Sequence, residues 1–107
     1  METERESLIL EIKKLSNDLV DFYKNRFNFR NHCYLRIAYD SAVENKWDKV
    51  VNKPFVKYAN LEQLACVRDF LQDYFVNHNK LIANNINSLS IRNQNKSANK
   101  ISENMLF

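Results

Sequence analysis

The chain of 107 residues contains no glycine, although average usage would supply about seven. Glycine lets a backbone approach a phosphate closely or take a left-handed turn without a steric penalty. The glycine-rich phosphate loops of nucleotide-binding proteins, the G-x-S-x-G turn of α/β-hydrolases and the usual EF-hand loop all depend on it. These three classes of site are therefore excluded, and no nucleotide cofactor is expected.

Asparagine is abundant in the same chain, with 16 occurrences. Among the residues that have a Cβ atom, Asn adopts the left-handed conformation at helix ends and turns most readily. We therefore expect asparagines, among them Asn31, Asn60 and Asn77, to occupy caps and turns. Asn and Lys also have A/T-rich codons, so the base composition of the genome is a second explanation for the missing glycine.

Length and composition indicate one small domain that is neither secreted nor embedded in a membrane. With 45% hydrophobic residues, the chain can bury a modest core. It has no run of about 18 apolar residues that could span a bilayer, and its first residues are acidic and polar, unlike a signal peptide. We expect a cytoplasmic protein in which Cys33 and Cys66 are buried free thiols.

The first predicted helix begins near residue 4, because Thr3 and Glu6 have the spacing of a capping box. Apolar residues then recur at intervals of four and three and share one face of a helix over about 4–26. This N-terminal seam consists of Leu8, Ile12, Leu15, Leu19 and Phe22. It either completes the core of its own chain or binds a partner helix or a second copy.

A second helix is predicted over about 32–46, with Asn31 as its cap. Apolar residues alternate between Cys33 and Tyr39, so a strand is the alternative for this segment. Arg36 and Asp40 lie four residues apart. We expect these two side chains to form an exposed ion pair.

Pro54 makes the segment 47–59 a connector, because proline disfavours helix at the residue before it and lacks a backbone donor. The apolar residues of this connector are expected to lie against the core. Asn60 and Gln63 form a second capping box, which begins a third helix over about 61–77 with a possible extension to 90.

The sequence thus predicts an all-α fold, a small bundle of three main helices. A single helical domain covers 1–90. The segment 91–107 has too few apolar residues to pack, and we expect it to be a disordered polar and basic tail.

No motif predicts catalysis, a cofactor or a metal site. The soft metal ligands are His32, Cys33, Cys66 and His78, and they lack the paired spacing of structural zinc sites. A nucleophilic role for Cys33 with His78 has no local signature. We therefore expect a protein that is not an enzyme, and catalysis by Cys33 or His32 ranks third among the possible functions.

Basic and aromatic residues are concentrated between residues 24 and 58, where eight bases and three acids give a net charge of +5. Cations that neutralise phosphates and rings that stack on unpaired bases are the combination used to bind nucleic acid. The candidate contacts are Lys24, Arg26, Arg30, Arg36, Lys46, Trp47, Lys49 and Lys53. The alternative is that the aromatic side chains form the core and the charges a solvated surface.

The block from Asn31 to Lys57, NHCYLRIAYDSAVENKWDKVVNKPFVK, resembles a pattern in small bacterial and prophage-type proteins that have no established activity. The pattern continues in the NLEQL stretch at 60–64. The resemblance implies a phage or mobile-element origin, and it assigns no site residue. Similar sequences are sometimes labelled acetyltransferases, but the acetyl-coenzyme A loop uses a glycine that this chain does not have.

These observations predict a non-enzymatic helical interaction protein. It would bind a protein partner or self-associate through the N-terminal seam. The alternative function is a nucleic-acid-binding module that uses the basic and aromatic segment 24–58.

Overall fold

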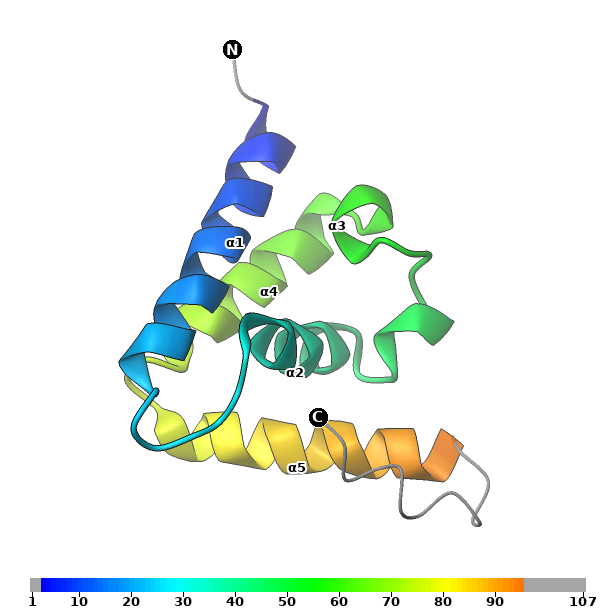
Figure 1. The fold of residues 1–107 in the computed structure, drawn as a ribbon. Helices are drawn as coiled ribbons and strands as arrows, with labels where there is room; N and C mark the ends of the chain where they lie inside the picture. Colours follow the sequence, from blue (N-terminus) through cyan, green and yellow to red (C-terminus); the bar gives the residue numbers. More distant parts are fainter. Residues whose placement is uncertain (1–2, 96–107) are drawn as a thin grey trace.

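The computed structural model describes residues 3–95, which form helices joined by short loops (Figure 1). The long helices in this part of the chain are α1 (Glu4–Phe22), α2 (Asn31–Val43), α4 (Leu61–Asp73) and α5 (His78–Asn95). A short 3-10 helix, η1 (Trp47–Lys49), and the single-turn helix α3 (Phe55–Tyr58) lie between α2 and α4. Residues 3–95 contain no strand, so the all-α prediction is confirmed and the strand alternative for the second helix is wrong.

The predicted third helix over 61–77, with its extension to 90, is in fact two helices. α4 ends at Asp73, and the side chain of Asn77 caps α5 by accepting a hydrogen bond from the backbone N–H of Lys80 at 3.2 Å. The chain changes direction between the two helices (Figure 1). α5 continues to Asn95, past the predicted domain end at 90. The rest of the predicted disordered tail, 96–107, lies outside the described residues.

Both predicted capping boxes are present. Thr3 and Glu6 exchange hydrogen bonds of 3.1 and 3.0 Å between side chain and backbone at the start of α1, and Asn60 caps α4 in the same way. Asn31 does not cap α2 as predicted. It is the first residue of that helix, and its side-chain amide donates to the Asn17 side chain on α1 at 3.0 Å.

The end of α2 shows how the chain turns without glycine. Glu44 has φ 58° and ψ 39°, the left-handed conformation, which is costly for a residue with a Cβ atom. It is the one residue with positive φ in the described part of the chain, so the expectation that Asn takes this conformation is wrong. The turn is retained because the backbone N–H groups of Glu44 and Asn45 both donate to the carbonyl of Asp40.

Glu44→Gly is expected to raise the free energy of unfolding by about 1 kcal/mol, because glycine takes the left-handed conformation without a clash. Urea denaturation followed by far-UV circular dichroism measures the change. Glu44→Gln is the matched control: it removes the charge, keeps the Cβ atom and should change stability by less than about 0.5 kcal/mol. A loss of stability in Glu44→Gly would show that the conformation carries no strain.

The hydrophobic core lies where α1, α2 and α4 meet. α1 packs against α4 and α2, and α2 also packs against α4 and α5. The largest fully buried apolar side chains are Tyr34, Tyr74, Phe55, Ile12, Leu19, Ile37, Leu64 and Leu71. The connector lies against this core as predicted, because Phe55 stacks on Tyr39 with ring centroids 4.0 Å apart.

One hydroxyl in this core has no hydrogen-bond partner among the described residues. It belongs to Tyr34, whose side chain is fully buried. Burial raises the pKa of Tyr34 far above its ordinary value, since a phenolate there would lose its contact with water. The hydroxyl of Tyr23, in contrast, donates to the backbone carbonyl of Tyr74.

Tyr34→Phe is expected to raise the free energy of unfolding by about 1 kcal/mol, because the Tyr34 hydroxyl gives up water on folding and gains no partner. Tyr23→Phe removes the same atom from a hydroxyl that is bonded, and should lower the free energy of unfolding by about 1 kcal/mol. Parallel urea titrations compare the two variants. Equal losses in both would mean that the Tyr34 hydroxyl is satisfied in solution.

Candidate functional site

The N-terminal seam faces the inside of the chain. Four of its residues lie in or against the core: Leu8, Ile12, Leu15 and Leu19. Phe22 differs, since 57% of it is exposed and its ring lies against that of Phe75, with centroids 5.2 Å apart. The seam therefore completes the chain's own core. Of the two predicted roles of the seam, the packing of these four side chains supports the first, completion of the chain's own core.

Six of the candidate nucleic-acid contacts fall into two groups, one before and one after α2. Lys24, Arg26 and Arg30 lie in the segment between α1 and α2. Lys46, Lys49 and Lys53 lie beyond the other end of α2, whose 13 residues span about 20 Å. The two groups of basic residues are therefore separated by the length of α2.

Two of these candidates are withdrawn from the surface, Trp47 in part and Arg36 almost completely. Trp47 packs edge-on against Tyr39 and Phe55, with ring centroids 5.5 and 5.6 Å away. Only 8% of Arg36 is exposed. Of the seven aromatic side chains in the segment, six lie in or against the core, and Tyr58 is exposed. The aromatic residues thus support the alternative that they form the core.

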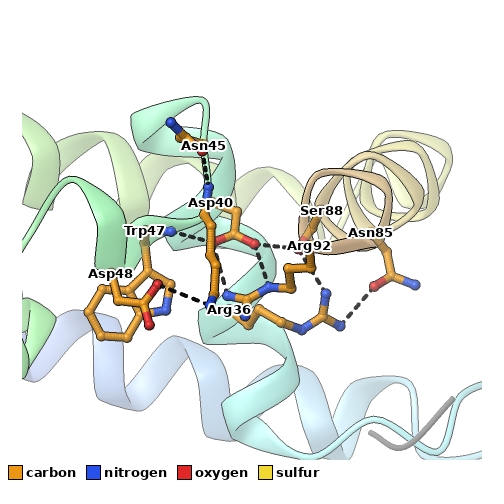
Figure 2. Close-up of polar contacts among 9 residues, drawn as sticks. Arg36, Asp40, Asn45, Trp47, Asp48, Asn85, Ser88 and Arg92 are labelled. Carbon is orange, nitrogen blue, oxygen red and sulfur yellow. Dashed lines mark hydrogen bonds and ion pairs between the residues drawn. The ribbon is translucent and has the colours of Figure 1, made fainter. Parts of the chain in front are cut away.

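The buried polar group that joins α2 to α5 is the carboxylate of Asp40, of which 1% is exposed. Its oxygens accept hydrogen bonds from the guanidinium of Arg92 at 2.9 and 3.1 Å (Figure 2). They also accept from the hydroxyl of Ser88 and from the backbone N–H of Trp47. A two-point arginine–carboxylate contact is among the strongest polar contacts in proteins. Asp40 therefore fixes α5 on α2 and also holds the chain as it leaves α2.

Arg36 extends this group from the same helix. Its guanidinium donates to the hydroxyl of Ser88 at 2.8 Å and to the side-chain oxygen of Asn85 at 2.9 Å. Burial and the neighbouring Arg92 lower the pKa of Arg36, while Asp40 acts in the opposite direction. We call Arg36, Asp40, Asn85, Ser88 and Arg92 the Asp40 cluster. The predicted exposed ion pair of Arg36 and Asp40 is wrong, because both side chains are buried.

Sequence reasoning missed the half of the Asp40 cluster that lies on α5. Asn85, Ser88 and Arg92 recur at intervals of three and four residues, which places them on one side of a helix. This polar stripe was visible in the sequence. The helix to which this stripe bonds, α2, could not be predicted, because the sequence pattern of α5 carries no information on which helix packs against it.

α5 bonds to α2 through polar side chains and carries apolar side chains elsewhere on its surface. Leu81 is its one fully buried apolar residue among the described side chains, whereas 38% of Ile82 and 61% of Ile86 are exposed. No residue from 81 to 91 is charged. The apolar stripe of a surface helix ordinarily faces the core. We define the outer face of α5 as Ile82, Ala83, Ile86, Leu89, Ser90 and Asn93.

A hollow of about 320 Å³ between α4 and α5 is lined by Cys66, Asp69, Phe70, Asp73 and Lys80. The ammonium of Lys80 lies 3.7 Å from the Asp73 carboxylate and 5.2 Å from the Phe70 ring centroid, so a cation from the chain itself already interacts there. Burial and the nearby Asp69 raise the pKa of the Cys66 thiol. Cys66 is therefore a weak nucleophile.

Both cysteines are free thiols as predicted, but only Cys33 is buried, and Cys66 is half-buried. His32 and His78 are exposed. Within residues 3–95, no group of three or more His, Cys, Asp or Glu side chains is placed to hold a metal ion. No helix in the same range is long and apolar enough to cross a bilayer.

The block from Asn31 to Lys57 forms α2, η1 and the start of α3. It supplies Arg36 and Asp40 to the Asp40 cluster, together with the backbone donor of Trp47. Comparison with family models, with curated proteins and with solved structures gave no match to this chain.

Proposed function

We propose that this chain is a non-enzymatic protein-interaction module that contacts another protein through the outer face of α5. The observation that supports this proposal is the distribution of side chains on α5, which turns polar residues toward α2 and leaves apolar residues exposed. Asn85, Ser88 and Arg92 bond to α2, while Ile82 and Ile86 are left exposed. Interfaces between proteins are depleted of charged residues at their centre, and the stretch 81–91 has none.

The arrangement of the Asp40 cluster supports a structural role rather than a catalytic one. The oxygens of Asp40 accept hydrogen bonds from two guanidinium nitrogens, a hydroxyl and a backbone N–H. A carboxylate with this many donors stabilises its surroundings and is poorly placed to take a proton from a substrate. We therefore assign the cluster to holding α5 in position, with its outer face exposed.

A photoreactive amino acid at position 86 tests this proposal in cells that express the full chain. We expect irradiation to give a covalent adduct with a protein, and Ile82→Asp in the same chain to remove the adduct. The matched control places the photoreactive residue at Lys13, which is exposed on α1. Equal adducts from positions 86 and 13 would overturn the proposal.

Nuclease treatment before irradiation separates the proposal from the nucleic-acid alternative. We expect the adduct from position 86 to be unchanged, because the outer face of α5 has no cation with which to bind phosphates. Loss of the adduct after nuclease treatment would favour binding of nucleic acid through the exposed Lys and Arg side chains of segment 24–58. The purified chain would then be expected to bind mixed DNA and RNA at low salt.

A further inference from the structure

The outer face of α5 has the spacing of a coiled-coil seam. Ile82, Ile86, Leu89 and Asn93 follow one another at intervals of four, three and four residues. In a heptad these are positions d, a, d and a. Ile82 and Ile86 are exposed and Leu89 is half-buried. The pattern thus continues along the part of α5 that faces away from the Asp40 cluster.

An open hollow of about 450 Å³ lies on this face and is lined by Ile86, Leu89, Ser90 and Asn93. Leu89, Ser90 and Asn93 follow Ile86 by three, four and seven positions. Four side chains with this spacing surround a hole on the surface of a helix. In a coiled coil, each a or d side chain of one helix enters such a hole on the other helix. The four residues that line the hollow are therefore spaced as such a hole requires.

We infer that the partner of the outer face is a second copy of this chain, joined along α5 as a parallel two-stranded coiled coil; this inference rests on the proposed function. Ile86 at a and Leu89 at d are the pair that favours two parallel strands, while Ile82 occupies the other d position. A polar Asn at an a position pairs with its equivalent and sets the register. Asn93 occupies that position, so in two copies aligned in register the two Asn93 side chains can form hydrogen bonds with each other.

The charges around the outer face allow two copies to approach. The stretch 81–91 has no charge, so no like charges meet along the seam. Lys80 and Arg92, which flank it, are paired within their own chain with Asp73 and Asp40. The residues beside the seam, Ala83 and Ser90, are small and let two helices come close.

Among residues 3–95, α5 is placed where a second copy can reach its outer face. α5 lies at one edge of the molecule and α2 lies on its inner side (Figure 1). Its 18 residues form a rod about 27 Å long. The seam is short, so we expect reversible dimers rather than a permanent complex.

Sedimentation equilibrium of the purified full chain tests this inference. We expect a reversible monomer–dimer equilibrium at micromolar concentrations, and Ile86→Asp should weaken the association by about a hundredfold. Asn87→Asp is the matched control, since it adds the same charge one residue away, outside the seam. A dimer that Ile86→Asp leaves intact, or a chain that stays monomeric throughout, would overturn the inference.

Two further variants test the parallel register. Asn93→Cys, made together with Cys66→Ser, should form a disulfide between the two copies on mild oxidation, because equivalent positions meet only in a parallel dimer. Asn93→Ile should tighten the association and add trimers, since the polar residue no longer selects two strands. A dimer in which Asn93→Cys does not cross-link would be antiparallel and would contradict the inference.

Failure of the dimer and failure of the proposed function give different results. A monomeric purified chain, combined with a position-86 adduct to a different protein in cells, would overturn the second copy and leave the proposed function standing. The absence of any adduct at position 86 would overturn both.

Discussion

Asp40→Ala is expected to lower the free energy of unfolding by about 3–5 kcal/mol, because it removes the carboxylate that lies beside the buried guanidinium of Arg36 and the partly buried guanidinium of Arg92. The hydroxyl of Ser88 and the backbone N–H of Trp47 lose an acceptor as well. Domains of this size are stable by only about 5–15 kcal/mol, so the variant should be close to unfolding. Urea denaturation followed by far-UV circular dichroism measures the loss.

Asp18→Ala is the matched control for Asp40→Ala. Asp18 pairs with Lys14 four residues before it at 2.7 Å, but 76% of the Lys14 side chain and 46% of the Asp18 side chain are exposed. We expect its removal to leave the unfolding midpoint unchanged, since exposed pairs contribute little. If Asp40→Ala is as stable as Asp18→Ala, the Asp40 cluster does not hold the fold together.

A double variant shows whether the loss comes from the buried charges. Asp40→Ala combined with Arg92→Leu removes the carboxylate and one of the two guanidinium groups, so it should recover part of the stability that Asp40→Ala loses. The departure from additivity measures the coupling between the two side chains. Purely additive losses would mean that Asp40 and Arg92 act independently.

Leu19→Ala is expected to lower the free energy of unfolding by about 2–5 kcal/mol, because it leaves a cavity in the core where α1 packs against α4 and α2. Leu19 is fully buried, whereas 54% of Leu10 on the same helix is exposed. Leu10→Ala should therefore cost less than about 0.5 kcal/mol. Calorimetric or urea unfolding of the two variants gives the comparison.

The same pair of variants decides what the N-terminal seam does. If the seam is core, Leu19→Ala loses stability, and the folded fraction keeps the association state of the parent chain. If the seam were an interface, Leu19→Ala would weaken association at high concentration and leave the stability of the monomer unchanged. The second result would contradict the packing of α1.

The features that the sequence predicted well are those set by neighbouring residues. The capping boxes at Thr3 and Asn60 require only a side chain and a backbone amide three residues apart, and both are present. The start of α1 and the apolar faces of α1 and α4 follow from the same short-range rules. Asn77 is a partial success, because it was expected at a cap or turn but not as the start of a separate helix.

The features that the sequence predicted badly depend on contacts between residues far apart in the chain. Arg36 and Asp40 have the spacing of an exposed pair, but Ser88 and Arg92 on α5 cover them, about fifty residues later. Trp47 is of a residue type that stacks on nucleic-acid bases, but it is half-buried against Tyr39 and Phe55. In each case the neighbour that decides exposure is distant in sequence.

By itself, the absence of glycine determined which classes of site the chain cannot build, and short-range periodicity determined that it is helical. The sequence could not determine where the left-handed turn falls. Glu44 adopts that conformation because its own backbone N–H and that of Asn45 both donate to the carbonyl of Asp40. Only the tertiary structure decided that the seam of α1 is core and that α5 has an apolar outer face. The physical reason is that hydrophobic periodicity marks a face for burial, while packing decides what buries it.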